Sequence, residues 1–276
     1  MPRGIHDSAL IVNAFRARKA DISGDRFADL WLSQDTQVWA SQYTQQVGLT
    51  EVLVHALRHR FFLESVRAFL KKTPDGVFIN IGAGFTNYPY LIPQEVSCCE
   101  IDTPVNLIFK KETLARLVRQ GYLPERTIEF IPVNDLNKIP TLETLMKTLK
   151  KWLNGQPSFV LCEGLFFYLK IEAISFLYQQ LSSVQQKGDI VASNSFRPEE
   201  TKKIMFQKLI KYCRTEYKKK NFIPTNLPTK FYEQQPLYSL LSHENYYRLS
   251  EKFAPGEKLE NPESVLEEDV YLLERC

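Results

Sequence analysis

Four short polar segments, each directly after a run of apolar residues, carry the side chains of this chain that could do chemistry. The first contains Gly82 and Gly84, a pair that permits positive φ and lets the backbone approach a ligand closely, because no Cβ stands in the way. The other three contribute acids, at Asp102, Asp135 and Glu163. A carboxylate at the tip of the second strand of an open α/β sheet can accept hydrogen bonds from ribose hydroxyls. Together these features indicate a site for a nucleotide-like ligand, although each alone is more often an ordinary turn or an exposed acid.

The spacing around the glycines separates two kinds of nucleotide cofactor. A dinucleotide site uses the pattern GxGxxG/A, whose third small residue lets the pyrophosphate reach a helix N-terminus. Here that position is Asn87, followed by Tyr88 and Pro89, so the dinucleotide pattern fails. S-adenosylmethionine carries no phosphate and needs only the close turn, an acid for the ribose and an adenine pocket. Asp135 could accept from the adenine amino group and Leu136 could cover the ring, so the sequence favours S-adenosylmethionine over NAD.

Alternating strands and helices are expected to position these residues. Apolar residues at helical spacing predict a long amphipathic helix over residues 49–72, and short runs typical of buried strands follow it. The expected strands are residues 77–81, 96–101, 127–133, 158–162 and 189–193, and the expected helices between them are residues 105–118, 141–153 and 171–184. This alternation predicts an α/β fold with a mostly parallel sheet that has helices on both faces.

We expect a single domain over residues 1–276, divided into four segments. Residues 1–48 look helical in pieces and are expected to form a cap or lid, and residues 49–196 are expected to form the cofactor-binding core. Residues 197–240 interrupt the alternation and are interpreted as an insertion on the side of the methyl acceptor. Residues 241–276 complete the sheet, and the final strand is expected to be antiparallel at one edge.

The composition is that of an ordinary globular protein, with 44% hydrophobic and 24% charged residues. The formal net charge of +3 is too small to indicate a nucleic acid or a membrane as partner, and the run Lys218-Lys219-Lys220 is typical of a solvated loop. No segment approaches the roughly 18 continuous apolar residues of a membrane span. The five cysteines show no metal-ligand spacing. We therefore expect a cytoplasmic protein without a metal site, which acts on a small-molecule substrate.

Several stretches resemble, in order, the leucine carboxyl methyltransferase family of S-adenosylmethionine-dependent O-methyltransferases, which includes bacterial members that methylate small natural products. They are Arg58-His59-Arg60-Phe61, Asn80-Ile81-Gly82-Ala83-Gly84, Glu100-Ile101-Asp102-Thr103-Pro104, Asp135-Leu136 and Glu163-Gly164-Leu165-Phe166-Phe167-Tyr168-Leu169. The last stretch is the most specific, and the set spans residues 58–169. The resemblance implies a class I methyltransferase fold, which is Rossmann-like, and it covers the cofactor half better than the substrate half.

The resemblance also implies a role for each matching residue. Arg58 would pair with the methionine carboxylate of the cofactor, which suits the two parallel hydrogen bonds of a guanidinium group. Glu163 would lie near the cofactor's amino group and sulfonium, where a negative charge is favourable. The other implied contacts are Gly82 and Gly84 for the methionine and ribose, Asp102 for the ribose, and Asp135 with Leu136 for the adenine.

Two segments leave questions that the resemblance does not answer. The family usually continues the glycine turn with Leu-Asp-Thr-Arg, whereas this chain has Phe85-Thr86-Asn87-Tyr88. The acid and the arginine are missing, so the sequence does not tell how this loop is held. The segment Arg16-Ala17-Arg18-Lys19 resembles the family's basic N-terminal helix without showing which basic residue faces the cofactor.

The methyl acceptor stays open at this stage. A carboxylate acceptor is already anionic and needs no general base, whereas a hydroxyl needs a base within hydrogen-bond reach. Among the four histidines, His243 is the candidate for that base, and only if the acceptor is a hydroxyl. Three functions remain. They are O-methylation of a carboxyl or hydroxyl of a small polyketide- or peptide-derived metabolite, free or carrier-bound; methyl-esterification of the C-terminal leucine of a protein; and a non-catalytic relative that binds the cofactor.

Overall fold

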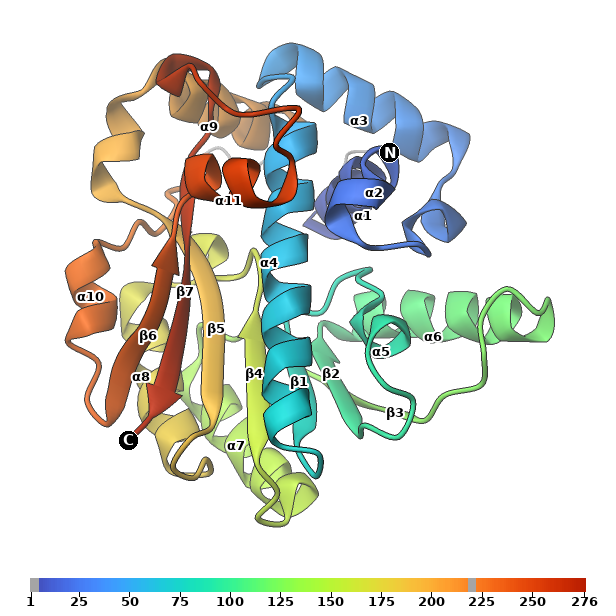
Figure 1. Cartoon of the computed structure of the whole chain (residues 1–276), viewed down its shortest axis with the longest axis vertical. Coiled ribbons are helices and arrows are strands. Elements are labelled where there is room, and N and C mark those ends of the chain that lie inside the picture. The colour runs from blue at the N-terminus through green and yellow to red at the C-terminus, as the bar shows by residue number, and fades with distance from the viewer. Residues whose placement is uncertain (1–4, 218–221) are drawn as a thin grey trace.

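The computed structural model describes residues 5–217 and 222–276. Its centre is a seven-stranded sheet with the order β3-β2-β1-β4-β5-β7-β6 (Figure 1). The strands are β1 (Val77–Ile81), β2 (Cys98–Asp102), β3 (Ile128–Pro132), β4 (Ser158–Cys162), β5 (Ile190–Phe196), β6 (Tyr238–Glu244) and β7 (Glu268–Arg275). Strands β1 to β5 pair in parallel, and β7 runs antiparallel to both of its neighbours. The predicted α/β fold with a mostly parallel sheet is confirmed.

Helices cover both faces of this sheet. On one face the long helix α4 packs together with α11, and on the other face α7 and α8 pack (Figure 1). Strands β1, β2 and β4 are buried along their whole length, as expected for parallel strands covered on two sides. The helices from α4 onward that frame the sheet are α4 (Glu51–Lys72), α5 (Tyr88–Leu91), α6 (Pro104–Arg119), α7 (Ile139–Leu153), η2 (Phe166–Tyr168), α8 (Ile171–Ser182), α11 (Tyr246–Phe253) and η4 (Pro262–Ser264).

The strands that carry the polar segments begin or end close to the predicted residues. β1 and β4 have the predicted bounds, because each is a short apolar run that ends at a glycine-containing turn. β2 begins at Cys98, two residues later than predicted, since Val96 still belongs to a turn in which its N–H donates to the Pro93 carbonyl oxygen. β5 continues to Phe196 because it pairs with β7 up to that residue. The polar ends of the parallel strands therefore meet at one edge of the sheet.

The position of the final strand in the sheet differs from the prediction. β7 is antiparallel, as expected, but the predicted edge position is wrong because β7 lies between β5 and β6. Val270, Tyr271 and Leu273 on β7 are fully buried, whereas β6 is largely half-exposed or exposed. β6 is the edge strand, and it begins at Tyr238, inside the segment interpreted as an insertion. The chain reaches the sheet earlier than predicted because the polar run of β6 does not look like a buried strand.

The helices before α4 and the helix α9 (Ile204–Glu216) gather at the end of the sheet where the parallel strands terminate, whereas α10 (Thr229–Glu233) lies beside β6 (Figure 1). As predicted, helical pieces precede α4, and α1 packs against both α3 and α4. They are α1 (Ile5–Arg18), α2 (Ala20–Ser23), η1 (Ala28–Trp31) and α3 (Gln34–Gln46), which we call the cap. After β5 come η3 (Pro198–Lys202), α9 and α10, and α9 packs against α3. The lysine run at 218–220 lies outside the described residues.

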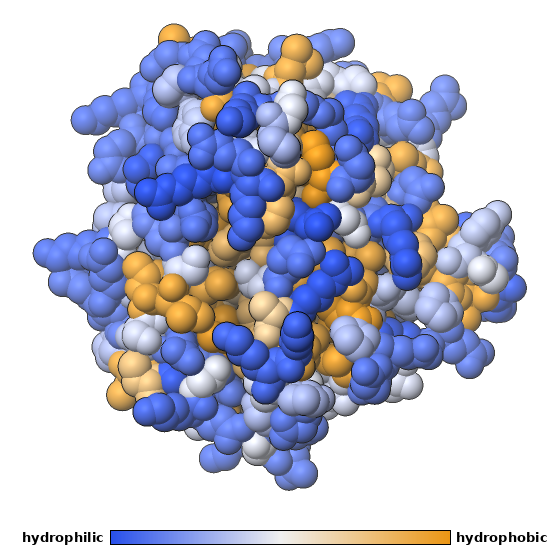
Figure 2. All heavy atoms as spheres, viewed as in Figure 1, coloured by the Kyte–Doolittle hydropathy of each residue, from blue (hydrophilic) through white to orange (hydrophobic). Residues whose placement is uncertain are grey.

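The surface of the molecule has both hydrophilic and apolar areas. Figure 2 shows a mostly hydrophilic rim, with apolar side chains gathered in separate groups across the middle of the face that α4 and α11 cover. In the described ranges, no helix combines the length and the apolar character that crossing a membrane requires. All five cysteines are free thiols, and only Cys276 is exposed.

Candidate functional site

A cavity of about 450 Å³ lies at the carboxyl ends of the parallel strands. This volume falls within the range of about 300 to 1,000 Å³ that is typical of small-molecule sites. Its walls come from α1, α4, the N-terminus of α6 and the loops after β1, β2, β3 and β4. All seven residues assigned to the cofactor from the sequence line this cavity: Arg58, Gly82, Gly84, Asp102, Asp135, Leu136 and Glu163. We call it the cofactor cavity.

The glycine turn needs glycine at both of its positions. Gly82 and Gly84 have φ values of 75° and 47°, in the left-handed region that L-residues rarely adopt. A Cβ on Gly82 would stand 3.0 Å from Leu165 Cδ1, and one on Gly84 would stand 3.2 Å from Ala9 Cβ. The turn is therefore pressed between the loop after β4 and the cap, with its backbone on the cavity wall.

Asp102, at the end of β2, organises the neighbouring backbone. Its Oδ2 accepts from the Gly84 N–H at 2.7 Å, and its Oδ1 accepts from the Thr103 N–H at 2.6 Å and from Asn106 Nδ2 at 2.7 Å. A carboxylate offers about four acceptor sites, so roughly one remains free for a ligand hydroxyl. This fits the predicted ribose contact and ties the acid to the glycine turn.

Asp135 and Leu136 lie on the cavity wall in the loop after β3, and both side chains are half-buried. Asp135 Oδ1 accepts from the Asn137 N–H at 2.9 Å, which closes a local turn. Within the described residues, the second carboxylate oxygen of Asp135 accepts no hydrogen bond, and it lies beside an apolar side chain. An acceptor next to an apolar surface suits the edge and face of a purine ring.

Arg58 and Glu163 form a buried ion pair on the wall of the cofactor cavity. Arg58 Nε donates to Glu163 Oε1 at 3.0 Å, and Nη1 donates to Glu268 Oε2 at 2.6 Å. Tyr88 Oη donates to Glu163 Oε2 at 2.7 Å. Within the described residues, Arg58 Nη2 makes no hydrogen bond, so it is the nitrogen that could meet a ligand carboxylate.

Glu163 is charged despite its burial. Burial alone would raise the pKa of this carboxyl, but the guanidinium of Arg58 outweighs the effect, helped by the hydrogen bond from Tyr88, and holds the pKa at about 2. Glu163 therefore places a negative charge on the cavity wall near neutral pH. Such a charge attracts the amino group and the sulfonium of S-adenosylmethionine.

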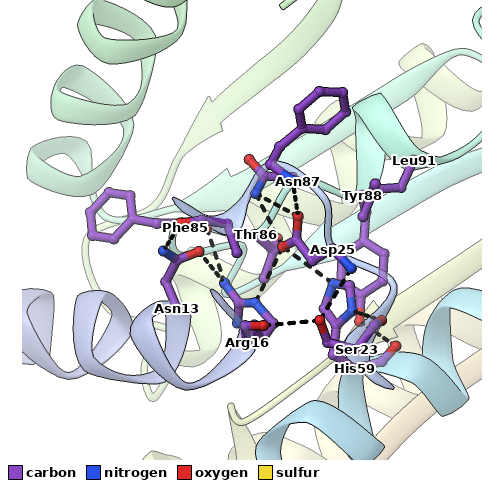
Figure 3. A network of polar contacts seen from close by, with 12 residues as sticks. Asn13, Arg16, Ser23, Asp25, His59, Phe85, Thr86, Asn87, Tyr88 and Leu91 are labelled. Atoms are coloured by element: carbon purple, nitrogen blue, oxygen red, sulfur yellow. Dashed lines mark hydrogen bonds and ion pairs between the residues drawn. The ribbon is translucent and has the colours of Figure 1, made fainter. Parts of the chain in front are cut away.

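A buried polar network holds the loop after the glycines against the cap (Figure 3). Arg16 Nη2 donates to the Phe85 carbonyl oxygen at 3.1 Å, and Arg16 Nε lies 3.4 Å from Asp25 Oδ2. The two oxygens of Asp25 accept from Asn87 Nδ2 at 2.9 and 3.1 Å, and Trp31 Nε1 donates to Asn87 Oδ1 at 2.8 Å. The acid and the arginine that this loop lacks, relative to the family pattern, thus have counterparts on the cap.

Contacts from the core fix the same loop on its other side. Thr86 Oγ1 donates to the Ala83 carbonyl oxygen at 2.9 Å and accepts from Asn80 Nδ2 at 3.0 Å. The ring of Tyr88 stacks on His59, with ring centroids 4.5 Å apart and an interplanar angle of 20°. The residues that depart from the family pattern therefore each have a partner that this chain provides.

His243 is not brought to this site. It lies on the edge strand β6, where Nε2 is 2.7 Å from Asp269 Oδ2 and the ring stacks on Tyr271 with centroids 4.7 Å apart. It is absent from the residues that line the cofactor cavity. The prediction of a general base at His243 thus gains no support from the geometry, because its contacts belong to the packing of β6 on β7.

Some cavity residues escaped the sequence analysis. Of the two arginines of α1, Arg16 lines the cavity, whereas Arg18 donates to the Gln37 carbonyl oxygen on α3. Ala9 and Val12 line the cavity from the same helix face as Arg16, a spacing that could have separated the two arginines. Asn106, which supports Asp102 from the first turn of α6, carried no recognisable signal.

Most of the chain matches the sequence model of one protein family. The sequence model of the leucine carboxyl methyltransferase family matches residues 9–182. No curated protein matches the chain significantly. The match extends beyond the quoted motifs and includes most of α1, all of α4 and the four loops of the cofactor cavity.

Solved structures share the fold at low sequence identity. A protein of Streptomyces avermitilis from the DUF574 family has a TM-score of 0.63 and 12% identity, with 98% of this chain and 97% of that chain covered. A protein of Thermobifida fusca provisionally assigned as a methyltransferase has a TM-score of 0.62 and 12% identity, with 93% and 94% covered. Magnesium protoporphyrin IX methyltransferase of Synechocystis, with bound S-adenosylhomocysteine, has a TM-score of 0.51 and 12% identity, with 90% and 97% covered. At this identity, they support the class I methyltransferase fold alone.

The family match, the fold and a cavity whose residues fit a phosphate-free nucleoside cofactor agree with one another. This chain belongs to the leucine carboxyl methyltransferase family, and its cofactor is S-adenosylmethionine.

Proposed function

We propose that this protein is an O-methyltransferase that methylates a carboxyl or hydroxyl oxygen of a small metabolite, either free or bound to a carrier. One observation carries the proposal. A second cavity of about 80 Å³ adjoins the cofactor cavity, and the two share lining residues. The shared residues are Ser8, Val12, Arg58, Gly164 and Tyr168. We call this space the acceptor cavity, and its size suits the reacting end of a small molecule.

The residues of the chain then have distinct tasks. S-adenosylmethionine supplies the methyl group, activated by its sulfonium. Glu163 and Arg58 fix the charged amino-acid part of the cofactor at the border between the two cavities, and Asp102 fixes the ribose. Enclosure by α1 excludes water, so the main contribution of the protein is alignment of the acceptor with the methyl group.

The alternative of a protein C-terminal leucine as acceptor comes from the family description. The small volume of the acceptor cavity, about 80 Å³ between the cap, α4 and α9, favours a small molecule over a protein tail. We also propose a cytoplasmic location, in keeping with the sequence analysis, and no nucleic acid or membrane as partner.

The proposal is tested by label transfer from methyl-labelled S-adenosylmethionine to a mixed panel of small carboxylic acids, alcohols, phenols, amines and thiols, together with a peptide ending in leucine. We expect the label in an O-methyl product. Treatment with alkali separates the two oxygen classes, because methyl esters are hydrolysed and methyl ethers are stable. Label found only on nitrogen, on sulfur or on the peptide would overturn the proposal.

A further inference from the structure

The acceptor cavity has a polar stripe on one helix and apolar walls around it. The stripe consists of Glu51, His55 and Arg58, which follow one another at spacings of four and three on α4 and so share a face. The remaining walls come largely from apolar and aromatic side chains of α1, α9, the loop after β4, the end of β5 and the segment before β7. Those that do not border the cofactor cavity include Ile11, Val54, Phe167, Phe196, Leu209 and Leu266.

Near neutral pH the titratable groups of α4 on this lining offer no uncompensated positive charge. The guanidinium of Arg58 is already matched by two carboxylates, Glu268 Oε2 at 2.6 Å from Nη1 and Glu163 Oε1 at 3.0 Å from Nε. Burial raises the pKa of Glu51 to about 8, against the hydrogen bond from Tyr43, so this carboxyl stays protonated. Burial, together with the nearby cation of Arg58, lowers the pKa of His55 to about 3, so this imidazole stays neutral.

The hydrogen bonds of His55 fix which nitrogen can act as an acceptor. His55 Nδ1 lies 2.8 Å from the Glu51 backbone carbonyl oxygen. A carbonyl oxygen only accepts, so the proton of the neutral ring sits on Nδ1 and the lone pair is on Nε2. No described residue makes a hydrogen bond to Nε2, and the ring is held by Phe15, with centroids 5.4 Å apart. His55 therefore presents a bare acceptor on the lining of an apolar cavity.

We propose that the acceptor cavity takes an uncharged hydroxyl group on a small apolar substrate, and that His55 Nε2 accepts the hydrogen bond of that hydroxyl. The inference rests on the proposed function and decides between the two oxygen classes that the sequence left open. An ionised carboxylate would bring a further negative charge beside an Arg58 that already has two carboxylate partners, and it would face the Nε2 lone pair, so both contacts disfavour it. A hydroxyl brings no charge and supplies the missing donor.

The same arrangement provides an acceptor for the proton that the substrate hydroxyl loses on methylation. As the hydroxyl oxygen forms its bond to the methyl carbon, the electron pair of the carbon–sulfur bond remains on sulfur and the hydroxyl proton moves to His55 Nε2. The positive charge thus passes from the sulfonium to the imidazole, and the two adjoining cavities together keep the same net charge. A weak base suffices, because an oxygen that gains a methyl group becomes strongly acidic as the bond forms.

The test uses the full chain with isotope-labelled histidine nitrogens, saturated with S-adenosylhomocysteine and observed by NMR. The chain has only four histidines, and a His55→Phe variant identifies the signal of His55. Isobutanol and isobutyrate, which share a branched chain and differ in the hydroxyl or carboxylate end, are the probes. We expect isobutanol to shift the Nε2 signal of His55 saturably, with a dissociation constant at least roughly tenfold lower than that of isobutyrate.

Variants of residues in and away from the acceptor cavity test whether the probe binds in that cavity. Leu209→Trp fills the acceptor cavity from α9 without touching the cofactor cavity, and it should abolish the isobutanol shift while S-adenosylhomocysteine still binds. Ile204→Trp, on the exposed side of the same helix, should change nothing. If Leu209→Trp does not fold, Leu266→Phe replaces it.

The inference is overturned if isobutyrate shifts the signal as strongly as isobutanol, if neither probe shifts it, or if the response survives in the filled variant. A native protein that does not bind S-adenosylhomocysteine would instead refute the proposed function, so the two failures are distinguishable.

Discussion

Two buried glutamates on adjoining cavities have opposite charge states. Glu163, on the cofactor cavity, is held ionised by Arg58, and its pKa lies at about 2. Glu51, on the acceptor cavity, has no cationic hydrogen-bond partner, and burial raises its pKa to about 8. Burial is nearly complete at both sites, so the partner decides the charge.

The two cavities also differ in charge over the rest of their lining. The cofactor cavity is lined by charged and hydrogen-bonded groups at the ends of successive strands, such as Asp102 and Glu163. Apart from the ion pair of Arg58 and Glu268, the acceptor cavity is lined by Glu51 and His55, which burial keeps neutral, and by apolar side chains from distant parts of the chain. A charged cofactor and an uncharged acceptor group are the ligands that these two environments favour.

The largest effect is expected for Glu163→Gln. The folded-state pKa lies below the ordinary value of 4.5, so Glu163 stabilises the fold above about pH 4.5 and that stabilisation is lost as the pH falls toward about 2. At neutral pH we expect the variant to lose about 3 kcal/mol of unfolding free energy. Urea unfolding across acidic pH measures this loss and its decline.

The exposed Glu172 on α8 supplies the matched control, since Glu172→Gln should be neutral at every pH. Equal stability of Glu163→Gln and the native protein at neutral pH would show that Arg58 does not hold Glu163 ionised.

The opposite sign is expected for Glu51→Gln. Here the folded-state pKa lies above the ordinary value, so the stability linked to this group is fully present below about pH 4.5 and is lost as the pH rises toward about 8. Glutamine does not titrate and avoids the loss, although its amide needs new partners. We expect the variant to be about 2 kcal/mol more stable than the native protein near pH 7, and no more stable below pH 4.5. A variant that is destabilised equally at all pH values would remove the contrast between the two cavities.

The smallest effect is expected for Thr86→Val, which keeps the shape of the side chain. Without its hydroxyl the buried amide of Asn80 loses an acceptor, and the loop loses its bond to the Ala83 carbonyl oxygen. We expect a loss of about 1.5 kcal/mol in unfolding free energy and a weakening of S-adenosylhomocysteine binding of about threefold. Thermal unfolding and calorimetry measure both, with Thr148→Val on the exposed face of α7 as control. Unchanged binding and stability would mean that this contact does not hold the loop.

Much of the cofactor half could be predicted because its chemistry sits in short continuous motifs. Glycine turns and acids at strand ends are local in sequence, and the parallel sheet gathers them at one edge. Asp102 and Gly84 were therefore identified together although 18 residues separate them, and the structure joins them by one hydrogen bond.

The rest depends on pairings between distant segments, which leave no local signal. Arg16 and Asp25 meet the glycine loop from 62 and more residues away, and Glu268 reaches Arg58 across 210. His55 looked like any other helix histidine, because its role depends on walls supplied by α1 and α9. His243 was chosen for its place in the sequence near the predicted insertion, but the fold puts it on the edge strand β6.

The central claim is that the seven residues around the cofactor cavity bind S-adenosylmethionine. The most direct measurement is a calorimetric titration of the native protein, Asp102→Ala and the control Glu112→Ala with S-adenosylhomocysteine, with NAD as a second ligand. We predict micromolar binding by the native protein and the control, a loss of about 100-fold in Asp102→Ala because a charged hydrogen-bond acceptor and the anchor of Gly84 disappear together, and no binding of NAD. Native-like binding by Asp102→Ala, or no binding by the native protein, would contradict the account.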